Sequence, residues 1–201
     1  MSTDGVNHSR RRMLIGTTAA VGAVGAAFVA TPFVKSWNPS AKAKAAGAAV
    51  TADISKLELG QQMVVEWRGK PVWVVRRTPE VLSDIKSGKV AADLRDPQSE
   101  ESVQPDFAKN EYRTPKGKEE YIILVGICTH LGCSPLYRPE VAPADLGQSW
   151  RGGFFCPCHG STYDMAGRVY KSVPAPLNLE VPPYKYSVSY THLRAHETVL
   201  D

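Results

Sequence analysis

All four cysteines of this 201-residue chain lie in one short stretch, together with two of its five histidines. The first group reads CTHLGC at 128–133, and the second reads CPCH at 156–159. Thiolates and neutral imidazoles are ligands for zinc and for iron-sulfur clusters, so the residue types alone leave both kinds of site open. Because these residues are confined to one stretch, we expect a single site built from two loops.

The spacing favours a two-iron cluster over a structural zinc ion. Zinc sites usually place two to four residues between paired cysteines, whereas 22 residues separate Cys133 from Cys156. Each loop supplies one cysteine and one histidine, with a further cysteine left over. A cluster with two cysteines on one iron and two histidines on the other needs this supply. The leftover cysteines could form a disulfide between the loops, as exported proteins often do.

The two loops resemble the cluster-binding boxes of Rieske iron-sulfur proteins, in CTHLGC at 128–133 and CPCHGSTY at 156–163. The leftover cysteine pair resembles that of the Rieske subunits of ubiquinol-cytochrome c reductases. The resemblance extends from the arginines near the start of the chain to about Tyr186. It includes RRTPE at 76–80 and VPAPLNLEVPPY at 173–184.

The resemblance implies one Rieske-type [2Fe-2S] cluster. Cys128 and Cys156 would bind its inner iron, and His130 and His159 its outer iron. Neutral imidazoles in place of thiolates make such a cluster easier to reduce, with potentials of about −150 to +300 mV. The resemblance also implies a disulfide between Cys133 and Cys158. Closing a loop of about 25 residues would stabilise the fold by roughly 3 kcal/mol in the chain-entropy model.

Further roles follow from the same resemblance. The hydroxyls of Ser161 and Tyr163 would donate hydrogen bonds to cluster and cysteine sulfur and raise the potential further. A turn serine and a packing tyrosine are the structural alternatives. Leu131 and Gly132 would form a docking tip, and residues Pro174, Ala175 and Pro176 would form a proline loop that limits solvent access. Both of these segments could instead be ordinary turns.

The implied function is one-electron oxidation of ubiquinol at a pocket in a b-type cytochrome, with the electron passing to a c-type cytochrome. Each histidine ligand keeps one free ring nitrogen, so electron arrival and proton uptake are coupled, and His159 would meet the quinol hydroxyl. This is the activity of quinol-cytochrome-c reductase, a dimeric, multi-subunit, proton-translocating complex of the respiratory chain. The alternatives are a Rieske electron carrier of another exported oxidoreductase and, less favoured, a zinc-binding interaction domain.

The N-terminal segment must hold this domain at a membrane. No charged residue occurs from Met13 to Val34, a length that spans roughly 33 Å as a helix, so we predict a transmembrane anchor at 13–35. SRRRMLI at 9–15 matches the twin-arginine export pattern. We therefore expect residues 1–12 in the cytoplasm and the folded domain on the periplasmic side of a bacterial inner membrane. Small residues at 41–45 leave a cleavable signal peptide as the alternative.

Residues 36–53 are rich in alanine and lysine, which predicts a flexible tether. Residues 54–186 contain short β-prone runs, which predict an all-β antiparallel domain. The resemblance implies that this domain is of the Rieske type, with a small cluster-binding subdomain. The expected strands lie at 63–67, 71–77, 121–127, 152–156, 167–170 and 177–181. We expect one helix, starting at Pro79 after a Thr78 cap and stopping at Gly88. Residues 91–118 read as a long surface excursion.

The remaining features exclude or limit other functions. The net charge of +4 is modest, and no basic and aromatic stripe is present, so we expect no nucleic acid partner. Residues 187–201 depart from the Rieske pattern and look like translated sequencing-adapter DNA, which leaves open whether they belong to the natural protein. We assign no role to their two histidines, His192 and His196.

Overall fold

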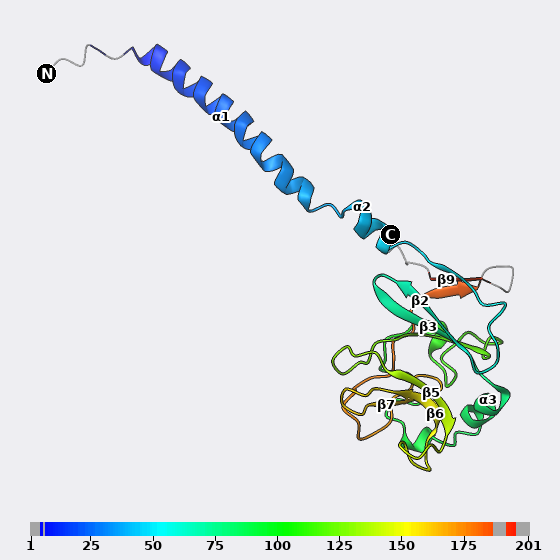
Figure 1. The fold of residues 1–201 in the computed structure, drawn as a ribbon. Helices are drawn as coiled ribbons and strands as arrows, with labels where there is room; N and C mark the ends of the chain where they lie inside the picture. Colours follow the sequence, from blue (N-terminus) through cyan, green and yellow to red (C-terminus); the bar gives the residue numbers. More distant parts are fainter. Residues whose placement is uncertain (1–4, 6, 187–191, 196–201) are drawn as a thin grey trace. The chain divides into compact units, whose positions relative to one another are not determined.

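The computed structural model describes residues 5, 7–186 and 192–195. The chain divides into two units, Met1–Ala45 and Ala46–Asp201. Among the described residues, the first unit is mainly helical and every strand lies in the second (Figure 1).

The first unit consists mainly of α1, His8–Ser36. The helix begins after Asn7, whose side chain accepts a hydrogen bond from the Arg10 amide at 3.1 Å. None of its residues is buried, and its apolar part has a mean hydropathy of 1.9. At about 1.5 Å per residue it extends over roughly 44 Å. By length and composition, α1 could therefore cross a membrane, and it is longer than the anchor predicted at 13–35.

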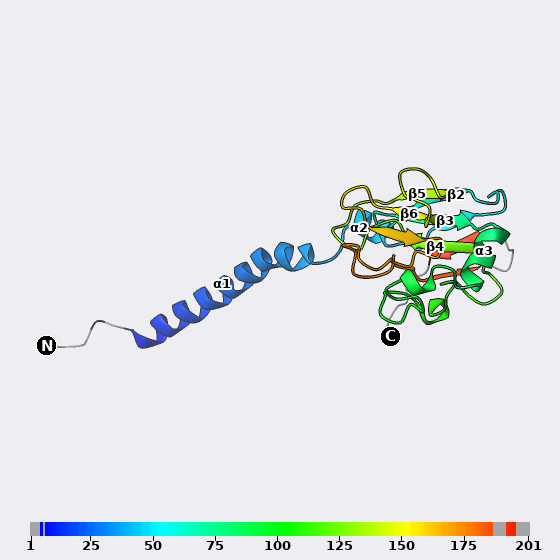
Figure 2. The same cartoon turned by 90° about the horizontal axis from the view of Figure 1, so that it is seen from below.

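The second unit contains three small antiparallel sheets (Figures 1 and 2). The first has the order β1-β9-β8, the second β2-β3-β4 and the third β5-β6-β7. The strands are β1 Thr51–Asp53, β2 Gln62–Trp67, β3 Lys70–Arg76, β4 Tyr121–Val125, β5 Leu136–Val141, β6 Arg151–Phe155, β7 Thr162–Asp164, β8 Tyr184–Tyr186 and β9 His192–Ala195. The predicted all-β antiparallel class is confirmed.

Turn and cap residues set two of the local structures. Arg68 and Gly69 have φ angles of 54° and 71°, as a tight hairpin between β2 and β3 requires, and Gly69 takes this conformation at little cost. Helix α3, Pro79–Lys86, begins after Thr78, whose hydroxyl accepts from the Val81 amide. The predicted helix and its cap are therefore confirmed.

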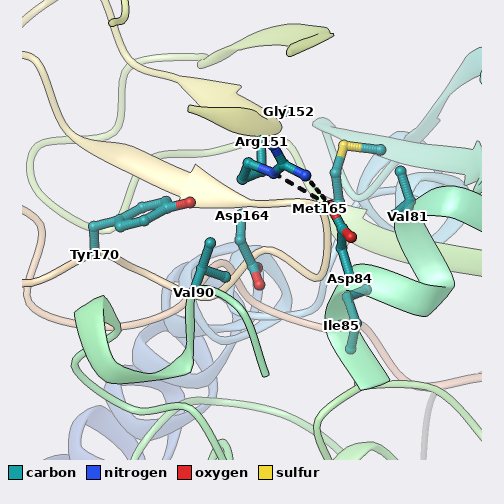
Figure 3. A pocket seen from close by; sticks show the side chains of 9 residues that line it. All are labelled: Val81, Asp84, Ile85, Val90, Arg151, Gly152, Asp164, Met165 and Tyr170. Atoms are coloured by element: carbon teal, nitrogen blue, oxygen red, sulfur yellow. Dashed lines mark hydrogen bonds and ion pairs between the residues drawn. The ribbon is translucent and has the colours of Figure 1, made fainter. Parts of the chain in front are cut away.

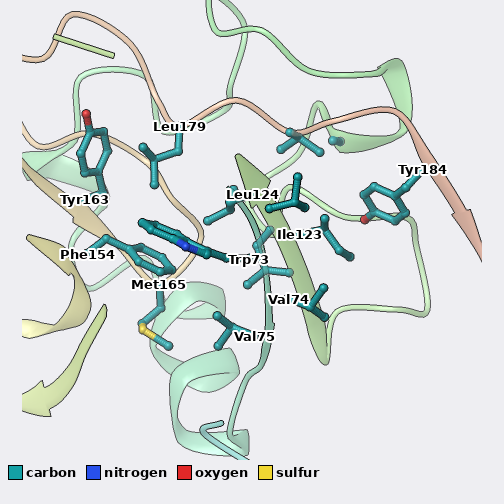
Figure 4. Close-up of a cluster of buried hydrophobic side chains, with 14 of the residues drawn as sticks. Trp73, Val74, Val75, Ile123, Leu124, Phe154, Tyr163, Met165, Leu179 and Tyr184 are labelled. Carbon is teal, nitrogen blue, oxygen red and sulfur yellow. The ribbon is translucent and has the colours of Figure 1, made fainter. Parts of the chain in front are cut away.

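The core contains buried residues of all three sheets (Figure 4). Trp73 of β3 stacks on Phe154 of β6 with ring centroids 5.1 Å apart, and the ring of Tyr137 of β5 lies 5.6 Å from that of Phe154. Tyr163 of β7 is fully buried with its ring in this core, while its hydroxyl points away from Trp73 and Phe154. The core therefore fixes the position of the third sheet, which carries the second cysteine loop.

Helix α3 packs against this third sheet. Arg151 of β6 donates two hydrogen bonds to Asp84 of α3, at 3.2 and 3.3 Å, across the mouth of a cavity of about 20 Å³ (Figure 3). A cavity of this size has room for about one water molecule. None of the residues around it belongs to the predicted site.

Two predicted strands are wrong. Residues 167–170 contribute only isolated bridges, Tyr163 with Val169 and Leu94 with Tyr170, and residues 177–181 form no strand. The backbone groups of 177–181 bond one by one to different neighbours, for example Leu179 N to Gly167 O and Val181 N to Val103 O. β-prone residues there are buried as an extended segment rather than as part of a ladder.

Several strands were absent from the prediction. β5 contains Pro139 and a register shift between Arg138 and Val141, which hides the alternating pattern of a strand. β1 lies inside the range 36–53 that we expected to be a tether, and its Ala52 is buried against the domain core. A short helix, α2 Ala41–Ala46, also lies in that range. The folded domain therefore starts a few residues before Ile54.

The segment 91–118 is not the surface excursion that its polar composition suggested. It contains short 3-10 helices at Ala91–Asp93 and Asp106–Ala108. Its buried residues include Leu94, Asp96, Ser99, Ser102, Ala108, Arg113 and Thr114. Burial lowers the pKa of Arg113 to about 10, because desolvation disfavours its charged form. The prediction was wrong because polar side chains are buried here as hydrogen-bonded partners.

The predicted atypical tail lies mostly outside the described residues. Only His192–Ala195 is described, as β9, which pairs with both β1 and β8.

Candidate metal centre

The two cysteine loops have the same backbone hydrogen bonds. In the first loop, between β4 and β5, Cys128 N donates to Cys133 O at 2.7 Å and Gly132 N donates to Cys128 O at 3.1 Å. In the second, between β6 and β7, Cys156 N donates to Ser161 O at 2.8 Å and Gly160 N donates to Cys156 O at 2.9 Å. Each loop thus folds around its first cysteine.

The glycine four residues after each of these cysteines makes the shared turn possible. Gly132 and Gly160 have φ angles of 83° and 74°, a left-handed conformation that residues with a Cβ rarely adopt. The sequence pattern CxxxG occurs in both boxes and is the local signal for this shared turn.

A disulfide between Cys133 and Cys158 joins the loops, as predicted, with Cα atoms 6.7 Å apart. The sulfurs of Cys133, Cys156 and Cys158 lie within 4.8 Å of one another. Because Cys133 and Cys158 are bonded to each other, only Cys156 offers a thiolate in this group. The disulfide therefore closes one side of the site without supplying ligands.

The two remaining cysteines are free and buried. Cys128 is 3% exposed and Cys156 is 1% exposed. Burial raises the pKa of Cys156, and the neighbouring Cys128 side chain raises it further. A thiolate at Cys156 is therefore disfavoured without a nearby cation, and a bound iron ion would supply the compensating charge.

The two histidines lie together at the outer end of the site. The ring centroids of His130 and His159 are 4.8 Å apart and the rings are perpendicular. His130 is partly buried and His159 is exposed. The imidazoles are therefore accessible to a partner from outside, whereas the free cysteines are not.

Tyr163 connects the first loop to the core. Its hydroxyl lies 3.1 Å from Cys128 Sγ and accepts a hydrogen bond from Thr129 N at 3.3 Å. Burial and the nearby Cys128 side chain raise the pKa of Tyr163, so the hydroxyl keeps its proton and can donate to sulfur. Thr129, which we did not single out from the sequence, lies 3.3 Å from the same hydroxyl and donates to Leu177 O at 2.7 Å.

The proline loop lies beside Ser161. Ala175 is fully buried, and its amide donates to Ser161 Oγ at 3.1 Å, while Pro174 and Pro176 are exposed. Among the residues that the structure describes, Ser161 Oγ has no protein acceptor, so its proton is available to a group in the site. Leu131 is 71% exposed and Gly132 is also exposed, at the apex of the first loop.

These donors fit a Rieske-type [2Fe-2S] cluster. Two buried free thiols and two outward imidazoles match the requirement for two sulfur and two nitrogen ligands on different irons. The Tyr163 hydroxyl beside Cys128 Sγ, and a disulfide that supplies no ligand, agree with a cluster of this type. A zinc ion held by all four cysteines is excluded, because two of them are bonded to each other.

Two family models match the chain and agree with this geometry. The family described as Rieske [2Fe-2S] domain matches residues 48–184, and the one described as Ubiquitinol-cytochrome C reductase Fe-S subunit TAT signal matches residues 1–40. The second match agrees with the predicted twin-arginine signal. A respiratory complex III chain from a hyperthermophile is similar at 28% identity with a TM-score of 0.46, covering 90% of this chain and 98% of that one.

Two curated relatives are named ubiquinol-cytochrome c reductase iron-sulfur subunit. The one from Allochromatium vinosum is 58% identical over 186 residues, which is 92% of this chain and 88% of that protein. The one from Blastochloris viridis is 45% identical over 193 residues, 96% of each chain. The chain therefore belongs to the family of Rieske [2Fe-2S] iron-sulfur proteins, in the group of the ubiquinol-cytochrome c reductase iron-sulfur subunits.

Proposed function

We propose that this chain is the electron-transfer subunit of a respiratory quinol-cytochrome c reductase. It would take one electron from ubiquinol at a b-type cytochrome and pass it to a c-type cytochrome, within a dimeric complex. The names of the curated relatives support this assignment over that of a Rieske carrier for another oxidoreductase. The single observation that carries it is the arrangement of the site, with buried Cys128 and Cys156 and an outer pair, His130 and His159.

In this proposal the four residues are the cluster ligands. Cys128 and Cys156 would bind one iron, and their burial would keep water from the thiolates. His130 and His159 would bind the other iron, with the more exposed imidazole of His159 open to a partner. When bound, a cluster of this type accepts and releases one electron.

The exposed imidazole performs the proton chemistry. The ring nitrogen of His159 that would not bind iron carries a proton in the neutral imidazole; once oxidised iron has acidified it and it is deprotonated, it could accept a hydrogen bond and then the proton of the quinol hydroxyl. Leu131, exposed beside the histidines, would bury its side chain in a pocket of the b-type cytochrome and exclude water from that hydrogen bond. The disulfide between Cys133 and Cys158 keeps the two loops in this arrangement during docking.

The proposed location is the periplasmic side of a bacterial inner membrane. The twin-arginine signal implies export after folding, and α1 is long and apolar enough to remain as an anchor. Since disulfides persist outside the cytoplasm, the Cys133–Cys158 bond agrees with an exported domain.

A redox-titrated electron paramagnetic resonance spectrum of membranes tests the proposal. We expect a Rieske-type signal that changes when an inhibitor occupies the quinol site, and loss of the signal in Cys128→Ala. Ser134→Ala, an exposed position in the same loop, is the control and should keep the signal. A wild-type signal that does not respond to the inhibitor would contradict quinol oxidation.

A further inference from the structure

Residues of the segment 91–118 form hydrogen bonds with the chain that follows the proline loop. Asn178 lies two residues after that loop, is 1% exposed, and is the centre of these contacts. Its side-chain amide donates to Asp96 O at 2.9 Å and to Ser99 Oγ at 3.0 Å. Its backbone amide donates to Ser102 Oγ at 3.0 Å. These contacts join positions about 80 residues apart in the sequence.

Asp96 holds the loop 96–102, which carries these hydrogen-bond partners of Asn178, in one conformation. Its carboxylate accepts hydrogen bonds from the amides of Glu100, Glu101 and Ser102, at 2.8, 3.2 and 3.2 Å. It also accepts from Ser102 Oγ at 2.9 Å. The loop 96–102 is therefore folded around a buried carboxylate, and it presents a preformed set of partners to Asn178. A buried polar network of this kind defines one geometry when every member is paired.

Asn178 also bonds to the segment that follows the second cysteine box. Its Oδ1 accepts from Val169 N at 2.8 Å, and Val169 bridges to Tyr163. Leu177 lies between the proline loop and Asn178, and its carbonyl oxygen accepts from Thr129 Oγ1 at 2.7 Å. The proline loop is thus held from the first cysteine box and from the segment 91–118 at once.

These contacts connect Asn178 to Ser161 through Ala175. Only three positions separate Asn178 from Ala175, whose amide donates to Ser161 Oγ at 3.1 Å. Because this contact uses a lone pair of the Ser161 oxygen, it directs the hydroxyl proton away from Ala175 and into the site. A shift of the proline loop would therefore change where the Ser161 hydroxyl points.

We propose that Asn178, held by Asp96 and Ser102, is a positioning residue of the cluster site that sets the orientation of the Ser161 hydroxyl through Ala175. The inference rests on the proposed function, because the cluster is the cofactor of that function. By this inference the segment 91–118 helps to set the reduction potential of the cluster. The polar composition of the segment does not suggest such a role.

The test compares Asn178→Ala with Asn110→Ala in the full chain in membranes. Asn110 is a matched control, because its side chain bonds Phe107 O, Thr114 O and Tyr112 N at 2.9 to 3.0 Å and reaches none of 161–179. We expect the equilibrium constant for cluster reduction to fall roughly tenfold in Asn178→Ala, equivalent to about 59 mV for one electron. We expect no such change in Asn110→Ala.

Amide hydrogen exchange of residues 173–177 provides a second measurement that does not depend on activity. Exchange there should be faster in Asn178→Ala and unchanged in Asn110→Ala. A wild-type potential and wild-type exchange in Asn178→Ala, with only a lower unfolding temperature, would overturn the inference and leave Asn178 a structural residue.

Ser102→Ala covers the case in which Asn178→Ala does not fold. It removes one hydroxyl and should shift the potential and the exchange in the same direction by a smaller amount. A folded Ser102→Ala with both quantities unchanged would overturn the inference. If the wild type gave no Rieske-type signal, the proposed function would fail, and the exchange measurement would still decide whether Asn178 holds the proline loop.

Discussion

The hydroxyl of Tyr163 lies 3.1 Å from the sulfur of Cys128, although the two residues are 35 positions apart in the sequence. The tyrosine ring is fully buried among Trp73, Phe154 and Leu179 (Figure 4), so the core determines where its hydroxyl lies. The polar contact at the sulfur therefore depends on apolar packing beneath it.

Tyr163→Phe should lower the reduction potential. Phenylalanine keeps the ring in the core but removes the hydrogen bond to Cys128 Sγ, which stabilises the more negative, reduced state. Since such a bond contributes about 1 to 2 kcal/mol, we expect a decrease of roughly 60 mV, measured by redox titration of the paramagnetic signal.

Tyr137→Phe is the matched control for this change. The Tyr137 hydroxyl donates to Gly60 O at 2.8 Å, and the Tyr137 ring packs on the same Phe154 ring. The control should keep the potential, and an equal decrease in both variants would show that the hydroxyl at Cys128 has no special effect.

Replacing both Cys133 and Cys158 by alanine should destabilise the domain. The bond closes a sequence separation of 25 residues, so its loss should lower the free energy of unfolding by roughly 3 kcal/mol in the chain-entropy model. Thermal unfolding followed by cluster absorbance should occur at a lower temperature than in the wild type or in Ser134→Ala. Equal unfolding temperatures would mean that the loops are held by other contacts.

The link between α3 and β6 should weaken in acid. Hydrogen bonds from Lys89 and then Arg151 lower the pKa of Asp84, so its ionised form stabilises the native state. This stability is complete above the unfolded pKa of about 3.9 and is lost as the pH falls through the lower native pKa. Asp84→Asn should therefore cost roughly 0.5 to 1 kcal/mol at pH 7. The difference from the wild type should shrink steadily below about pH 4.

Asp106→Asn is the control for this pH dependence. Asp106 pairs with Lys109, but its side chain is 95% exposed, so solvent screens the pair. We expect no measurable change in unfolding temperature at either pH. An Asp84→Asn variant that behaves like this control would contradict the stabilising role of the α3 contact.

Stiffening the proposed tether should slow turnover while leaving the cluster spectrum intact. If the domain must move between a quinol site and a c-type cytochrome, a rigid insertion of prolines between residues 46 and 50 restricts that motion. A glycine and serine insertion of equal length is the control and should slow turnover less. Unchanged quinol-cytochrome c reductase activity with the proline insertion would count against a moving domain.

Local patterns were sufficient to predict the elements with strong signals. The Thr78 cap with Pro79 predicts α3, and the hydrophobic runs around Trp73 and Ile123 predict two strands, whose pairing as β3 and β4 only the structure shows. The β-prone residues at 177–181 predict a strand, but in the structure this segment forms no β-ladder. Whether an extended segment becomes a strand depends on which neighbour lies beside it, and this information is not local.

The sequence by itself determined the supply of ligands, because four cysteines and two histidines in two boxes restrict the cofactor to very few kinds. It also determined the long apolar segment at the N-terminus and the antiparallel class of the domain. Only the tertiary structure decided how Asn178 meets Asp96 and how Ala175 meets Ser161. Asparagine, serine and aspartate in a polar stretch are read as turn formers. Their partners lie up to 82 residues away, so only the folded chain shows that they are buried and paired.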